Sequence, residues 1–223
     1  MHNSPVHTLM ITSRCSAGCR PCPFGQGTLP QRYLGAAEVI AAIAASTAEL
    51  VVITGGEPLE HPDFDAIVRG SAVAPGKALL RIATGGHVPL GELPELIRHN
   101  PRFSGFSVGT DVLTDATPHR EELTRMWQQN IQTLNEQNLR YSLTLTLHSS
   151  IQNAGEAIAN SAPASESTSP VQEALFPLRA AANLGARPEF IYLRHRENEE
   201  SAAHLRKEIE EIFENAVILC ESL

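Results

Sequence analysis

The chain has 223 residues, of which 42% are hydrophobic, enough to bury a substantial core in one domain or in two small ones. Its 25 acidic and 17 basic residues give a formal net charge of −8, which argues against a protein that neutralises nucleic-acid phosphates over a wide surface. No apolar run approaches the roughly 18 residues that a membrane helix needs. The first five residues lack the basic and apolar regions of a signal peptide, so we expect a cytoplasmic protein.

Short apolar runs alternate along the chain with segments of helical periodicity. The runs predict strands at residues 8–12, 50–54, 78–84, 103–108, 141–147 and 189–193. The helical segments follow them at residues 36–43, 62–73, 90–99, 123–134, 172–184 and 205–213. This alternation predicts an α/β fold with a parallel sheet and right-handed crossovers. Because a complete eight-unit barrel takes about 250 residues, we expect a partial (βα)6 TIM-like barrel that is open on one side.

One segment, at about residues 149–170, departs from this alternation and is rich in Ser, Ala, Asn, Glu and Pro. Such a composition predicts a long mobile loop, either a plain surface insertion or a lid that orders over a substrate. We therefore predict a single domain over residues 1–223, with its core at about 8–196. A C-terminal helix and a short strand are expected at about 201–220.

Three of the four cysteines, Cys15, Cys19 and Cys22, lie together directly after the first predicted strand. Clustered thiolates are soft ligands that select an iron–sulfur cluster, zinc or copper. A structural zinc site closes with four protein ligands, and neither His7 nor Cys220 has the usual paired spacing to supply the fourth. Three thiolates leave one iron of a cubane cluster open to a substrate or cofactor. We therefore favour a cluster, with a zinc-stabilised, non-catalytic binding module as the alternative from a different class.

Other chemically versatile residues follow the remaining predicted strands. They form the segments Gly55-Gly56-Glu57-Pro58, Thr84-Gly85-Gly86-His87, Ser107 to Asp111, Thr146-Leu147-His148 and Arg194-His195-Arg196. The carboxyl ends of parallel strands converge on one face, where ligands bind in such folds. We therefore expect these segments and the cysteine loop to share one site.

Together these motifs resemble those of the radical S-adenosylmethionine (radical SAM) superfamily. Cys15-x3-Cys19-x2-Cys22 matches the family's cluster motif, and Gly55-Gly56-Glu57-Pro58 matches its motif for the methionine amino group letter for letter. Thr84-Gly85-Gly86 is similar to the Thr-Asn-Gly often found after the third strand. The chain departs from the pattern at Pro21, where an aromatic residue is usual. Many peptide-modifying members carry a cysteine-bearing extension, whereas these 223 residues hold only one further cysteine, Cys220, so we expect a minimal member without an auxiliary-cluster domain.

The resemblance implies that Cys15, Cys19 and Cys22 hold a [4Fe–4S] cluster whose fourth iron binds SAM. One electron from the reduced cluster would cleave SAM to methionine and a 5′-deoxyadenosyl radical, which abstracts hydrogen from a small natural-product or peptide substrate. An electron donor such as flavodoxin or ferredoxin is then required. A glycyl-radical-enzyme-type activating enzyme, which acts on a large partner, is an alternative. So is a barrel that binds SAM without cleaving it.

The resemblance also suggests which residues contact SAM, with Phe24 offering apolar surface beside the adenine. The candidates are Gly55, Gly56, Glu57, Pro58, Phe24, Thr84, Ser107, Asp111, Thr146, His148 and Arg194. Cys220 closes an apolar run, which is typical of a buried structural thiol. The alternative for Cys220 is a hydrogen-atom donor, as in some epimerases of the family.

Overall fold

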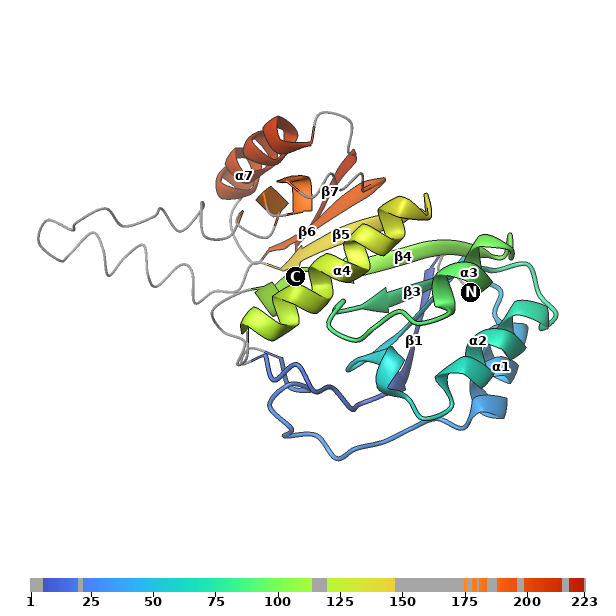
Figure 1. Cartoon of the computed structure of the whole chain (residues 1–223). Helices are drawn as coiled ribbons and strands as arrows, with labels where there is room; N and C mark the ends of the chain where they lie inside the picture. Colours follow the sequence, from blue (N-terminus) through green and yellow to red (C-terminus); the bar gives the residue numbers. More distant parts are fainter. Residues whose placement is uncertain are drawn as a thin grey trace, which may run out of the picture.

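The computed structural model describes residues 6–19, 22–113, 120–146, 175, 178–179, 181–183, 188–195, 199–213 and 217–222. Within these ranges one parallel sheet contains seven strands in chain order (Figure 1). They are β1 (Val6–Thr12), β2 (Leu50–Gly55), β3 (Leu79–Thr84), β4 (Phe103–Gly109), β5 (Tyr141–Thr146), β6 (Phe190–His195) and β7 (Val217–Ser222). The terminal strands β1 and β7 do not pair with each other, so the sheet stays open. The predicted partial barrel is confirmed, and the expected C-terminal strand joins it as a seventh strand beside β6.

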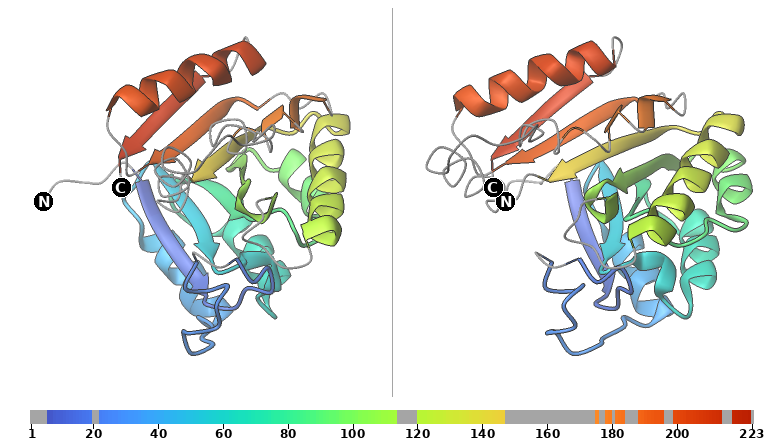
Figure 2. Two further views of the ribbon diagram at one scale, coloured as in Figure 1. Left: turned by 90° about the vertical axis from the view of Figure 1, so that its left-hand side faces the viewer. Right: turned by 60° about the vertical axis from the view of Figure 1, so that its left-hand side comes forward.

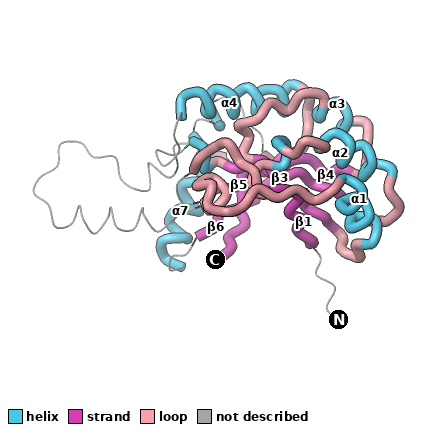
Figure 3. The backbone as a smooth tube through the Cα atoms, turned by 90° about the horizontal axis from the view of Figure 1, so that it is seen from below, coloured by secondary structure: helices cyan, strands magenta, loops and turns pink. Residues whose placement is uncertain are grey.

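Helices connect the strands and cover the outer side of the curved sheet (Figures 2 and 3). They are α1 (Ala36–Ala45), α2 (Phe64–Val73), α3 (Leu93–Arg98), α4 (Arg120–Glu136) and α7 (Glu199–Ile212), with short 3-10 helices η1 (Pro58–Glu60) and η2 (Asp111–Leu113). In the predicted helix at 172–184, residues 175, 178–179 and 181–183 are helical. The predicted loop at 149–170 lies outside the described residues. None of the described helices has the length and apolarity needed to cross a membrane.

The two faces of the sheet differ in composition. On the outer face, alternate residues such as Ile53, Ile82 and Phe106 are fully buried and pack in the same core as the helices. On the opposite face, here called the inner face, the central strands carry polar residues, including Arg81 on β3 and Ser107 on β4. This alternation shows that the inner face is not packed as a continuous apolar core.

The inner face also carries large apolar side chains that are between 41% and 52% exposed. Strand alternation places Val6 and Met10 of β1, Leu79 of β3, and Val217 and Leu219 of β7 on this face. The inner face therefore combines a polar centre with apolar side chains that no described residue covers completely.

Candidate active site

The cysteine loop begins where β1 ends and folds back onto that strand. Its returning segment is tied to β1 by hydrogen bonds from Ser13 N to Arg32 O (3.0 Å) and from Leu34 N to Ile11 O (2.9 Å). Inside the loop, Cys22 N donates to Cys19 O at 3.1 Å. The returning segment of the loop is therefore held against β1.

All three cysteines of the loop are free thiols, with Cys19 buried and Cys15 and Cys22 half-buried. Gly25 lies so close to the backbone of Cys19 that a Cβ atom on Gly25 would be 2.6 Å from Cys19 N. Burial raises the pKa of Cys15 to about 12, so its thiol keeps its proton until a metal displaces it.

The donor set fits an iron–sulfur cluster. The three thiols are soft ligands, the kind that iron–sulfur clusters take from cysteine. A cluster takes its thiolates from separate corners, as three cysteines around one loop would provide.

The Gly55-Gly56-Glu57-Pro58 turn is joined directly to the cysteine loop. Gly56 N donates to Thr12 O at 2.8 Å, and Glu57 N donates to Arg14 O at 2.7 Å. A Cβ atom on Gly55 would lie 2.4 Å from Thr12 O, and one on Gly56 would lie 2.3 Å from Arg14 O. Both positions require glycine because the two backbones touch.

The Glu57 side chain is fully buried and links this turn to the end of β3. Its carboxylate accepts hydrogen bonds from Thr84 Oγ1 (3.0 Å), Gly85 N (2.9 Å) and Leu59 N (3.2 Å). Burial raises the pKa of Glu57 above its ordinary value, although these donors and His87 oppose the effect. Glu57 therefore fastens the turns after β2 and β3 together.

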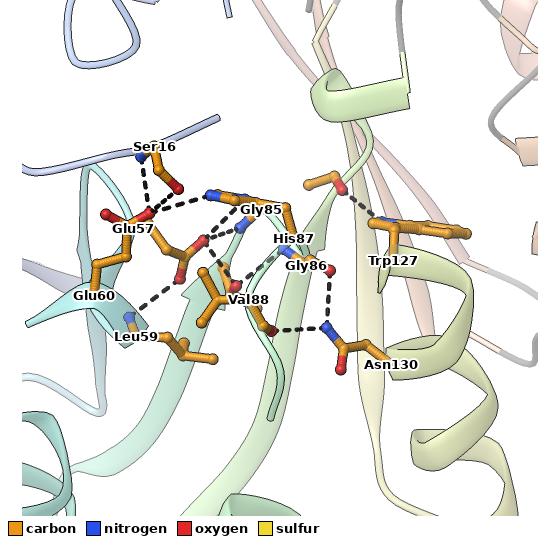
Figure 4. Close-up of polar contacts among 12 residues, drawn as sticks. Ser16, Glu57, Leu59, Glu60, Gly85, Gly86, His87, Val88, Trp127 and Asn130 are labelled. Atoms are coloured by element: carbon orange, nitrogen blue, oxygen red, sulfur yellow. Dashed lines mark hydrogen bonds and ion pairs between the residues drawn. The ribbon is translucent and has the colours of Figure 1, made fainter. Parts of the chain in front are cut away.

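A second carboxylate, Glu60 in η1, holds the cysteine loop from the other side (Figure 4). It accepts from Ser16 N at 2.8 Å, from Ser16 Oγ at 2.5 Å and from Arg14 Nε at 3.1 Å. Burial acts to raise the pKa of Glu60, but the neighbouring imidazole of His87 and the hydrogen bonds from Ser16 outweigh it and hold the pKa at about 2. Glu60 is thus ionised at any ordinary pH and fixes the residue next to Cys15.

The imidazole of His87 lies between the two carboxylates. His87 Nδ1 is 3.5 Å from Glu57 Oε2, and Nε2 is 3.5 Å from Glu60 Oε1. Its side chain is only 2% exposed. His87 therefore connects the turn after β3 to both carboxylates.

Side chains of helix α4 form hydrogen bonds to the backbone of the turn after β3 and of the end of β4. Asn130 Nδ2 donates to Gly86 O (2.8 Å) and to Val88 O (2.9 Å), and Trp127 Nε1 donates to Gly109 O (2.9 Å). Gly86 has a φ of +76°, and a Cβ atom there would lie 2.6 Å from Trp127 Cδ1. The helix predicted at residues 123–134 contains both Trp127 and Asn130, but the sequence did not indicate the contacts of Asn130. The available signal was an amide three residues after Trp127 on the same helix face.

Several residues predicted to contact SAM lie at or near this edge of the sheet. Phe24 follows Cys22 in the cysteine loop, Asp111 begins η2, and Thr84 donates to Glu57. Ser107 lies two residues before the end of β4, where its hydroxyl contacts Arg81 and Ser142.

The later candidates are placed by strand register alone. Thr146 on β5 pairs with Arg194 on β6, and Cys220 on β7 pairs with Leu193. The side chains of these residues lie outside what the structure describes, and so does the whole of His148.

The contact between the two motifs can be tested with Gly56→Ala. We expect the variant to lose about 3 kcal/mol of unfolding free energy, because its methyl group overlaps the Arg14 carbonyl. Urea unfolding followed by circular dichroism measures the change. Gly35→Ala is the matched control, since nothing lies within 4 Å of a Cβ atom there and the change should stay within about 0.5 kcal/mol. Equal losses in the two variants would contradict the contact.

The role of His87 can be tested with His87→Leu. The variant leaves the buried carboxylate of Glu57 and the half-buried one of Glu60 without the imidazole between them, so we expect a loss of about 3 kcal/mol in unfolding free energy. His99→Leu is the control, because His99 pairs with Glu95 at 2.9 Å on the exposed surface, where such a pair contributes less than about 1 kcal/mol. A His87 variant as stable as the His99 variant would show that the bridge contributes nothing.

Comparison with known proteins relates this geometry to a family. A sequence profile described as the radical SAM superfamily matches residues 9–152. No curated protein matches the chain. Among solved structures, SuiB of Streptococcus suis bound to S-adenosylmethionine has a TM-score of 0.67 at 10% identity, covering 97% of this chain and 50% of SuiB.

Two other solved structures agree in fold. SuiB bound to the precursor peptide SuiA has a TM-score of 0.66 at 11% identity, covering 97% of this chain and 48% of SuiB. Histidine-tagged anSMEcpe with bound AdoMet has a TM-score of 0.58 at 10% identity, covering 96% of this chain and 62% of that protein. The chain thus spans about half the length of SuiB. Because the family profile covers well over half of the chain, including the cysteine loop and the glycine turn, this protein belongs to the radical SAM superfamily of enzymes.

Proposed function

We propose that the chain holds a [4Fe–4S] cluster on Cys15, Cys19 and Cys22 and uses it to cleave SAM reductively. The observation that carries this proposal is the contact between the cysteine loop and the Gly55–Pro58 turn. Hydrogen bonds of 2.8 and 2.7 Å hold the two backbones together. A cofactor with its amino group at the turn would therefore lie beside the thiols.

The bound cluster would supply one electron that cleaves SAM to methionine and a 5′-deoxyadenosyl radical, which takes a hydrogen atom from the substrate. The protein supplies position and exclusion of water. Glu60 fixes Ser16 between two of the cysteines, and Glu57 fixes the turn after β3. The Glu57 carboxylate is occupied by these internal contacts, so the turn would bind the methionine amino group through its backbone.

The other candidate contacts belong to the same proposal. Phe24 would lie beside the adenine. Of the two candidates Ser107 and Asp111, we propose Asp111 for the ribose hydroxyls or the methionine carboxylate, because the Ser107 hydroxyl is already bound by Arg81 and Ser142. Thr146, His148 and Arg194 would complete the site from β5 and β6. An electron donor of the flavodoxin or ferredoxin class would reduce the cluster.

For the substrate we propose a small natural product or a peptide. The supporting observation is that SuiB, whose fold this chain resembles, has been solved with a precursor peptide. The exposed apolar side chains of the inner face support a substrate with an apolar part.

The proposal is tested with protein reconstituted anaerobically with iron and sulfide. We expect about four irons and an absorbance near about 400 nm in the wild type, with 5′-deoxyadenosine formed from SAM under dithionite. Cys19→Ala should lose both the absorbance and the cleavage, because the cluster loses one of its protein ligands. Iron and sulfide analysis with chromatography of the nucleoside product measures both effects.

Cys220→Ala is the matched cysteine control for metal content and should load iron and sulfide like the wild type. Full iron in Cys19→Ala would contradict the assignment of the cluster. One zinc per chain without labile sulfide in the wild type would favour a zinc-stabilised binding module instead.

A further inference from the structure

A charged residue occupies the centre of the inner face, where barrels of parallel strands normally pack branched apolar side chains. Arg81 lies on β3 between Leu80 and Ile82, which are both fully buried on the outer face. Its side chain therefore points to the inner face, where it meets residues of β4 and β5. Arg81 is only 7% exposed.

All of the acceptors that Arg81 meets are neutral. Nε donates to Ser107 Oγ at 3.0 Å, and Nη2 donates to Phe106 O at 2.9 Å and to Ser142 Oγ at 3.1 Å. Burial lowers the pKa of this guanidinium, but an arginine stays charged in proteins. The chain thus keeps a cation largely out of water, which is unfavourable without an anionic partner.

No carboxylate of the described residues forms an ion pair with Arg81. The nearby Glu189 is already paired with Arg140, and the exposed Arg69 pairs with Glu92 at 3.1 Å. The Nη1 amino group of Arg81 has no acceptor among the described residues and is not fully buried. Two N–H groups of a buried cation are therefore available to a ligand.

The two serines beside Arg81 hold its guanidinium in place. Ser107 Oγ and Ser142 Oγ are 3.1 Å apart, and each accepts from the guanidinium. Ser142 is fully buried and donates to Phe106 O at 3.5 Å, so the proton between the two hydroxyls comes from Ser107. With the fork fixed in this way, the N–H groups of Nη1 can form charge-assisted hydrogen bonds to a carboxylate, and such hydrogen bonds are the strong ones.

The position of Arg81 separates it from the proposed SAM site. It lies three residues before Thr84, the last residue of β3, or about 10 Å along the strand at the usual rise. Leu79, two residues earlier on the same face, is 46% exposed. The surroundings thus suit a group that carries an apolar body next to its charge.

We propose that Arg81, held in place by Ser107 and Ser142, binds a carboxylate of the substrate on the inner face of the sheet. This inference rests on the proposed function, because it assumes that a substrate enters the open barrel. It names the chemical class that the substrate carries: a carboxylate attached to an apolar body.

The test compares hexanoate with hexanamide, which have the same apolar body but differ in charge. Binding to the reconstituted enzyme is measured by ligand-observed NMR with saturating SAM and no reductant, so that the SAM site is filled. We expect hexanoate to bind about tenfold or more tightly than hexanamide, because a hydrogen bond to a charged group is lost with the amide. Equal binding of the two probes by the wild type would overturn the proposal.

The variant R81Q locates the effect and should abolish the preference for hexanoate. R69Q is the matched control, because Arg69 lies on the exposed side of α2, and it should keep the full preference. If R81Q fails to fold, S142A replaces it and should weaken hexanoate binding about threefold or more. An undiminished preference in R81Q, or in S142A where it replaces R81Q, would overturn the assignment.

Failure of this inference can be told apart from failure of the proposed function. Protein that cleaves SAM but binds both probes equally would reject the carboxylate subsite alone. None of the contacts of Arg81 involves the cysteine loop, so the same comparison can be made on protein that loads no cluster.

Discussion

The whole site depends on the contact of two backbones at the ends of β1 and β2. Gly55 and Gly56 approach the carbonyls of Thr12 and Arg14 more closely than any side chain would allow. This contact brings the cysteine loop against the glycine turn. Because both segments follow neighbouring parallel strands, the sheet itself supplies the alignment and the glycines supply the close approach.

The charged groups around this contact act as one unit. Glu57 reaches towards β3 and Glu60 reaches towards the cysteine loop, with His87 between them. Removing such groups from water is unfavourable, so their presence is better explained by the positions they enforce than by net stability. Three turns from β1, β2 and β3 are thereby held in one arrangement, as a preorganised site requires.

The strands, the open barrel and the cysteine motif could be predicted from the sequence because each is a local pattern. The polar contacts could not, because they join segments far apart in the chain. Glu60 looked like an ordinary acidic residue after the glycine turn, and its contact with Ser16 depends on how η1 packs against the loop. Arg81 lay inside an apolar run that predicts a strand, and its partners are visible only once β4 and β5 are in register. Asn130 was hidden in the same way on an amphipathic helix.

Arg81 lacks an ion-pair partner among the described residues because of where it lies in the fold and not because the chain is short of carboxylates. The chain has 25 acidic residues against 17 basic ones, so carboxylates are plentiful. They pair with arginines on the outside, as in Arg69 with Glu92 and Arg206 with Glu210, where such pairs contribute little. At the centre of the inner face, where a pair would count for more, the hydrogen-bond acceptors of Arg81 are two serines and a backbone carbonyl. The nearby carboxylate of Glu189 is paired with Arg140, so the guanidinium of Arg81 can accept an anionic partner from outside the chain.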